Sequence, residues 1–65
     1  MKPQVKLIGT DGNAFAIMGQ VKKAMNRFYE NRREADKHFE KYKKEATAGD
    51  YENLLQVTLK YCEVI

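Results

Sequence analysis

The chain has 65 residues, with twelve lysines and arginines against nine acidic residues, and a formal net charge of +3. A chain of about 60 residues buries only about 60% of the surface that it exposes when unfolded, so we expect one small domain (1–65) with a thin core. Its single cysteine excludes an internal disulfide. One cysteine and one histidine are also too few nitrogen and sulfur ligands for a zinc site.

Neither export nor membrane insertion is indicated by the sequence. No apolar stretch typical of a secretory signal follows Lys2, and the longest uninterrupted apolar run, 14–18, is far shorter than the ~20 residues of a membrane-spanning helix. A lone cysteine agrees with a reducing compartment. We therefore expect a cytoplasmic protein that does not enter a membrane.

A short β-prone run at 5–8 is followed by a cluster of turn-forming residues. The turn residues that we single out are Gly9, Asp11, Gly12 and Asn13. Aspartate and asparagine bond locally to the backbone, and glycine permits a positive φ. We expect Gly12 to adopt a positive φ and either Asp11 or Asn13 to cap the next helix. These residues are predicted to serve folding and not chemistry.

Three amphipathic helices are predicted, over 14–29, 32–47 and 51–60. Their apolar residues recur three and four positions apart, which places them on one face of each helix. We expect these faces to build the core, together with one residue of the first strand. The predicted core residues are Leu7, Ile17, Val21, Met25, Phe28, Phe39, Tyr42, Leu54, Leu55 and Leu59.

The helix boundaries follow from capping residues. Asn31 separates the first two helices, Gly49 is expected in a left-handed conformation after the second, and Asp50 is the N-cap of the third. The tail, 62–65, is predicted as a strand that pairs with 5–8, or with the same segment of a second copy. The expected fold is α+β and mostly helical, strand–helix–helix–helix–strand, with a small two-stranded ribbon packed on the helices.

Two segments carry a resemblance. The sequence Gly-Thr-Asp-Gly-Asn-Ala-Phe at 9–15 and the sequence Glu-Ala-Thr-Ala-Gly-Asp-Tyr-Glu-Asn-Leu-Leu at 45–55 resemble paired motifs, GxDGNAF and EAxxGDYxxLL. These motifs are found in a group of small uncharacterised bacterial and phage-type proteins without an assigned activity. The resemblance implies a compact domain from a bacterial or phage source, and it supplies no catalytic residues.

No combination of residues is typical of a catalytic site. We expect His38 to be a half-buried packing residue paired with Glu34, and Cys62 to be a small apolar filler. The turn at 9–13 lacks the sequence of a phosphate-binding loop and offers too few oxygen ligands for calcium. The sequence thus predicts a non-enzyme without a cofactor, metal ion or small-molecule substrate.

The strongest functional signal is a basic face on the first helix. No acidic residue occurs between positions 14 and 29, and the outward face carries Lys22, Lys23, Asn26 and Arg27. A stripe of one sign is what contacts to phosphates require, so nucleic-acid binding through this face is one hypothesis. We favour the other hypothesis, a protein-interaction module that binds a protein partner or a second copy, because small domains without pockets act by contacting partners.

Overall fold

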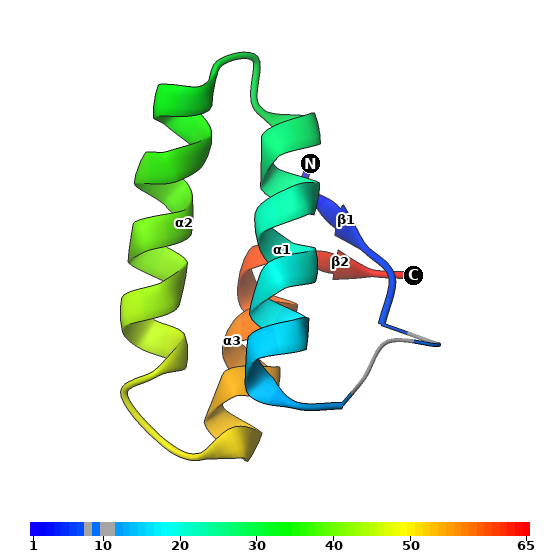
Figure 1. Ribbon diagram of the computed structural model, residues 1–65, viewed down its shortest axis with the longest axis vertical. Coiled ribbons are helices and arrows are strands. Elements are labelled where there is room, and N and C mark those ends of the chain that lie inside the picture. The colour runs from blue at the N-terminus through cyan, green and yellow to red at the C-terminus, as the bar shows by residue number, and fades with distance from the viewer. Residues whose placement is uncertain (8, 10–11) are drawn as a thin grey trace.

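The computed structural model describes residues 1–7, 9 and 12–65. The elements in chain order are β1 (Gln4–Val5), α1 (Ala14–Phe28), α2 (Arg32–Ala46), α3 (Tyr51–Tyr61) and β2 (Glu63–Val64) (Figure 1). This order confirms the predicted α+β fold, and each helix lies within one residue of its predicted bounds. Both strands are shorter than predicted, and Ile8, the last residue of the predicted first strand, lies outside the described residues.

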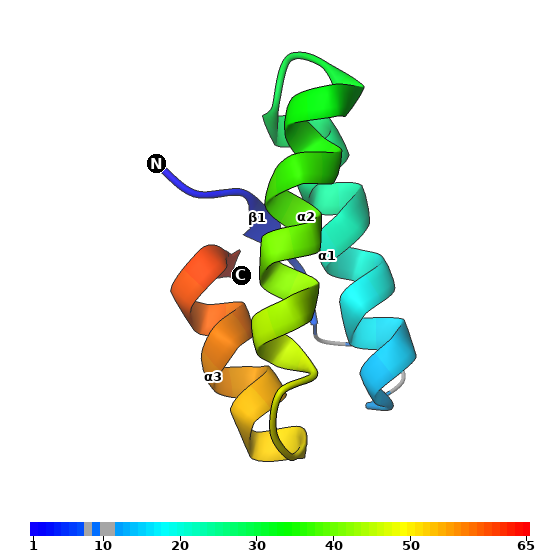
Figure 2. The ribbon, with the colours of Figure 1, turned by 90° about the vertical axis from the view of Figure 1, so that its left-hand side faces the viewer.

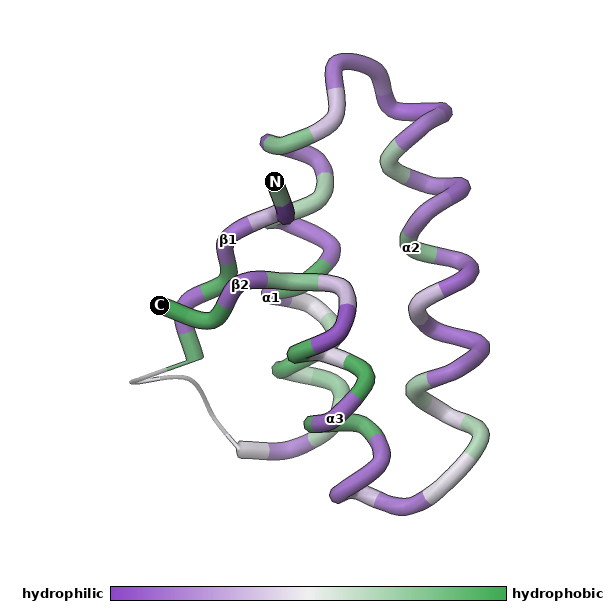
Figure 3. The backbone as a smooth tube through the Cα atoms, turned by 180° about the vertical axis from the view of Figure 1, so that it is seen from behind, coloured by the Kyte–Doolittle hydropathy of each residue, from purple (hydrophilic) through white to green (hydrophobic). Residues whose placement is uncertain are grey.

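The helices and the strand pair surround one core. α2 packs against both α1 and α3. Figures 1 and 2 together show α1 and α3 lying between α2 on one side and the strand pair on the other. The outward turns of α2 are hydrophilic, and the turns that face the other helices are apolar or pale in Figure 3. The strand pair therefore closes the side of the core that α2 leaves open.

The two strands are parallel and join segments from opposite parts of the chain. Gln4 is paired with Glu63 and Val5 with Val64, and the Glu63 amide donates a hydrogen bond to the Pro3 carbonyl at 2.8 Å. Parallel strands need a long crossover connection, which the three helices provide. Because side chains alternate along a strand, Val5 enters the core while Gln4 and Glu63 are exposed. Pairing of the predicted terminal segments within one chain is confirmed.

Every helix begins with a side-chain cap. The side-chain oxygens of the three caps accept hydrogen bonds from backbone amides three residues later, in the pairs Asn13–Ala16 (2.8 Å), Asn31–Glu34 (2.8 Å) and Asp50–Asn53 (3.0 Å). Each bond satisfies an amide that has no partner within its helix. The predicted break and the predicted third cap are confirmed, and Asn13 caps α1.

Half of the residues predicted to form the core are fully buried in the structure. Its buried apolar residues are Val5, Ile17, Met18, Val21, Ala24, Met25, Ala35, Tyr42, Ala46, Leu54, Val57 and Cys62. Leu7, Phe39 and Leu55 are half-buried and pack against this cluster. The small residues of α2, Ala35 and Ala46, allow that helix to approach its neighbours closely.

Two predicted core residues, Phe28 and Leu59, are exposed. Phe28 retains 37% of its surface because it is the last residue of α1, where its ring meets Tyr29 edge to face with centroids 5.0 Å apart. Leu59 is 57% exposed. The buried face of α3 includes Val57 and Thr58, and a helix turns about 100° per residue, so Leu59 lies beyond the edge of that face.

Tyr42 lies at the centre of the core with no exposed surface. Its hydroxyl is 2.8 Å from Thr58 Oγ1, and Thr58 donates its own hydrogen to the Leu54 carbonyl at 2.8 Å. Tyr42 is therefore the donor to Thr58. Burial raises the pKa of Tyr42, so the phenol keeps its proton at neutral pH and can donate this hydrogen bond. Its ring also contacts Phe39 and Tyr61, each with centroids 5.8 Å away.

The predicted backbone roles of two glycines are wrong. Among the described residues only Gly9 has a positive φ, +84°, so neither Gly12 nor Gly49 adopts the left-handed conformation. Glycine is needed at position 49 because there is no room for a side chain. A Cβ at this position would lie 2.9 Å from Cβ of Asn53, whose side chain is held by a hydrogen bond to the Glu45 carbonyl at 2.9 Å.

Replacing Leu54 and Leu59 separately by alanine tests which face of α3 is buried. Leu54→Ala is expected to lower the free energy of unfolding by about 2–5 kcal/mol because it opens a cavity in the core. Leu59→Ala is expected to change it by no more than about 0.5 kcal/mol because the side chain is mostly in water. Urea unfolding monitored by circular dichroism measures both. Similar losses in the two variants would contradict the assigned face.

The turn is tested by matched alanine substitutions at Gly9 and Gly12. Gly9→Ala places a Cβ in a left-handed conformation, at a cost of about 1–2 kcal/mol. Gly12→Ala is expected to be tolerated, since among the described residues its Cβ would meet only Tyr51 Oη, at 3.7 Å. Thermal unfolding should show the larger loss for Gly9→Ala. A greater loss of stability for Gly12→Ala would instead support the prediction that Gly12 needs a positive φ.

Candidate functional site

The predicted basic face is exposed, and three of its four residues gather at one place. Lys23, Asn26 and Arg27 line a shallow hollow on α1 of about 390 Å³, together with Gln20. These residues meet because positions three and four apart lie on the same side of a helix. Within the described residues the carboxylates of Glu34 and Glu45 lie against His38 and Lys60, and no carboxylate in that part of the chain neutralises Lys23 or Arg27.

Lys22 points to a different part of the surface. Its ammonium lies over the Phe39 ring of α2, 5.7 Å from the ring centre. An exposed contact between a cation and an aromatic ring is worth about 0.5–1 kcal/mol. The structure thus separates Lys22 from the other three residues and assigns it a contact between α1 and α2.

A larger groove of about 580 Å³ lies between the end of α1 and the strand pair. The α1 side is formed by Ala24, Arg27 and Phe28, and the strand side by Met1, Lys2, Gln4, Glu63 and Ile65. The parallel register places Gln4 next to Glu63 on the outer face of the ribbon, opposite the face that enters the core. This groove was not predicted from the sequence, although its position follows from the strand pairing.

The walls of the groove combine apolar and charged side chains. Phe28 and Ile65 are 37% and 55% exposed, and Met1 is fully exposed. The segment that follows β2 is hydrophobic and lies close to β1 in Figure 3. Arg27 lines both this groove and the shallow hollow, so the two depressions form a continuous surface on α1.

The charge within the groove is positive on balance. The charged residues that line it are Arg27 of α1 and, on the strand side, Lys2 and Glu63. The Lys2 ammonium lies 3.4 Å from the carbonyl oxygen of Leu59. Lys23, in the adjoining hollow, adds a further positive charge. The surface is therefore suited to an anionic group beside an apolar one.

Asn13 and Gly12, two of the described turn residues, have structural partners. Asn13 caps α1, and the Gly12 carbonyl accepts a hydrogen bond from the Tyr51 hydroxyl at the start of α3. This bond connects the turn to α3. Asp11, which was predicted as part of the same turn, lies outside the described residues.

The single histidine and the single cysteine lie where they were expected. The His38 imidazole is half-buried, stacks on Tyr29 with centroids 4.3 Å apart, and lies 3.6 Å from a carboxylate oxygen of Glu34. Cys62 is 2% exposed, and burial raises the pKa of its thiol to about 11 although Lys2 opposes that rise. The described residues contain no cluster of three or more histidine, cysteine or acidic side chains that could hold a metal ion.

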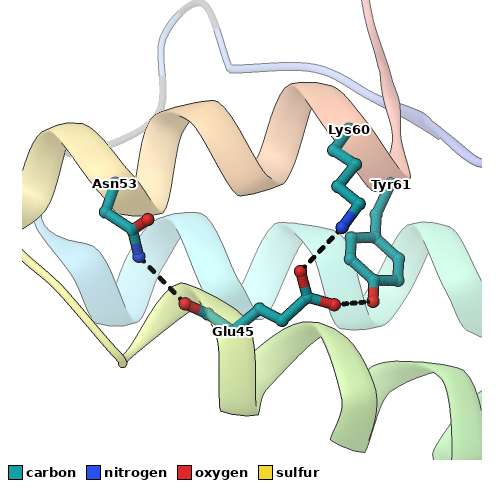
Figure 4. A network of polar contacts seen from close by, with 4 residues as sticks. All are labelled: Glu45, Asn53, Lys60 and Tyr61. Carbon is teal, nitrogen blue, oxygen red and sulfur yellow. Dashed lines mark hydrogen bonds and ion pairs between the residues drawn. The ribbon is translucent and has the colours of Figure 1, made fainter.

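A polar network at the end of α2 holds α3 in place (Figure 4). One carboxylate oxygen of Glu45 accepts a hydrogen bond from Lys60 at 2.8 Å, and the other accepts a bond from the Tyr61 hydroxyl. The Glu45 carbonyl accepts a bond from the Asn53 amide at 2.9 Å. The bonds from Lys60 and Tyr61 lower the pKa of Glu45, and the same contacts raise the pKa values of Lys60 and Tyr61.

Comparisons with protein-family models, curated proteins and solved structures find no match for this chain. The resemblance based on the two sequence motifs stays a prediction. Among the described residues, none of the helices combines the length and the apolar character that a membrane crossing requires.

From this network we predict that the stabilisation contributed by Glu45 is lost in acid. Because its folded-state pKa lies below the ordinary value of 4.5, its ionised form stabilises the fold above pH 4.5, and this contribution is lost as the pH falls through the lowered pKa. The difference in unfolding free energy between wild type and Glu45→Gln should therefore narrow below pH 4.5. Urea unfolding at several pH values measures it.

Glu40→Gln serves as the control for this experiment. Glu40 is exposed on the same helix, and the described residues offer it no ion pair. Its substitution should leave the acid dependence of stability close to that of wild type. A gap between wild type and Glu45→Gln that stays constant with pH would contradict the assigned role of the network.

Proposed function

We propose that this protein is a non-enzymatic protein-interaction module of a bacterial or phage-type cytoplasm, and that it binds a partner protein in the groove between α1 and the strand pair. The observation that carries the proposal is the exposure of Phe28 and Ile65 in a groove rimmed by polar residues. Apolar surface gathered in one depression and rimmed by polar groups is typical of interaction sites. Covering it removes apolar area from water at about 25 cal/mol per Å².

The placement of the reactive side chains supports a binding role. Neither His38 nor Cys62 lines the groove, the imidazole is stacked on Tyr29, and the thiol is buried and protonated at neutral pH. The side chains that do line the groove are apolar, amide, cationic and carboxylate groups. Such a mixture recognises a ligand by shape and charge.

A different protein is favoured over a second copy as the partner. The groove and the adjoining hollow both have an excess of positive charge from Lys2, Lys23 and Arg27. A symmetric dimer across this surface would bring like charges together, which is unfavourable. A partner of opposite charge meets no such repulsion.

Nucleic-acid binding through α1 is the second candidate. Lys23, Asn26 and Arg27 gather in one hollow, and α1 contains no acidic residue. Against it, the set of positive charges is small, Lys22 points away from the hollow, and Glu63 would repel phosphates near the groove. We therefore rank it below protein binding.

The proposal is tested by selecting peptides from a random library displayed on phage and measuring their affinities by fluorescence polarisation. Phe28→Ala should lower the affinity for the selected peptides by about tenfold or more, because it removes an aromatic wall of the groove. Phe15→Ala is the matched control, since Phe15 is 84% exposed on the same helix but does not line the groove.

Equal binding by wild type and Phe28→Ala, or a library that yields no binder, would contradict the proposed site. A DNA duplex of unrelated sequence tests the second candidate. Tight binding to it that falls steeply with salt and is lost in Lys23→Glu would replace protein binding by nucleic-acid binding.

A further inference from the structure

We infer that the segment recognised by the groove is acidic and apolar, with a carboxylate beside a large apolar side chain. The carboxylate is bound by Arg27, and the apolar side chain fills the space between Phe28 and Ile65. This inference rests on the proposed function and adds to it the chemistry of the partner.

Arg27 is the residue that specifies the carboxylate. Its guanidinium is planar and has several N–H groups in a fixed geometry that matches the two oxygens of a carboxylate. Glu63 lines the same groove, yet no ion pair joins it to Arg27 in the described part of the chain. The guanidinium therefore has its donors available for an anion that enters from outside.

The charges around Arg27 reinforce this choice. Lys23 flanks it in the adjoining hollow, and Lys2 lines the groove with its ammonium hydrogen-bonded to the Leu59 carbonyl, so the surface around Arg27 has a net positive charge. Such an arrangement increases the rate of encounter with an acidic segment and disfavours basic ones. The effect is strongest at low salt, since the Debye length is about 8 Å at physiological ionic strength.

The apolar walls and the size of the groove define the rest of the segment. A volume of about 580 Å³ lies within the range of small-ligand sites, which is enough for a few side chains. Phe28 and Ile65 present apolar surface from opposite sides. A strongly anionic polymer would leave these walls exposed to water, and the Glu63 carboxylate would repel it. A short acidic and apolar stretch of polypeptide fits both features.

The test uses the peptides selected on the wild-type protein, with two readouts. Their sequences should be enriched in aspartate or glutamate next to leucine, isoleucine, methionine or phenylalanine. Their affinity should fall about tenfold or more in Arg27→Glu and should fall with added salt in wild type. Arg33→Glu is the charge-matched control, because Arg33 is exposed on α2 and does not line the groove. It should leave the affinity within about twofold of wild type.

The outcomes separate the inference from the proposed function. Peptides that depend on Phe28 but have no acidic enrichment and bind Arg27→Glu as well as wild type would overturn the inference alone. If neither Phe28→Ala nor Arg27→Glu changes the affinity of the peptides, the groove is not the binding site and the proposed function fails with it. A circular dichroism spectrum of Arg27→Glu identical to that of wild type excludes misfolding as the cause of lost binding, and chemical-shift changes at Ala24, Arg27 and Glu63 on titration would place the peptide in the groove.

Discussion

The hydrogen bond from Tyr42 to Thr58 sets the distance between α2 and α3, and much of the structure depends on it. A large phenol can occupy the centre of so small a core only if its hydroxyl finds an acceptor, because an unsatisfied buried hydroxyl costs about 1–3 kcal/mol. Thr58 meets this need with its oxygen and donates its own hydrogen to the Leu54 carbonyl. The centre of the molecule is thereby both filled and hydrogen-bonded.

The position of α3 determines that of the strand pair. A single residue separates β2 from α3, so the helix that Tyr42 and the Glu45 network hold in place also positions Glu63 at the edge of β1. The pairing in turn defines one wall of the groove, and the end of α1 defines the other. Core packing and the proposed binding surface are therefore connected through one short segment of backbone.

The features that the sequence predicts well are local ones. Helix bounds follow from apolar spacing and from caps such as Asn31, both of which act within a few residues. The direction of two-residue strands is decided by tertiary packing and has no local signal. The same spacing that marks the core also includes Phe28, so periodicity alone does not reveal that its ring leaves the core where α1 ends. The groove was missed for this reason, whereas the basic residues beside it were found.

The ribbon has a consequence for the order of events in folding. β1 and β2 are separated by nearly the whole chain, whereas most helix contacts join helices that are neighbours in sequence, so loop closure makes the ribbon slow to form and easy to open. If β1 and β2 separate briefly while the three helices stay intact, the groove loses the wall that the strands form. A partner bound there would hold the two distant segments together, so association would suppress these openings and slow amide exchange at Glu63 and Ile65, whose N–H groups form the ladder.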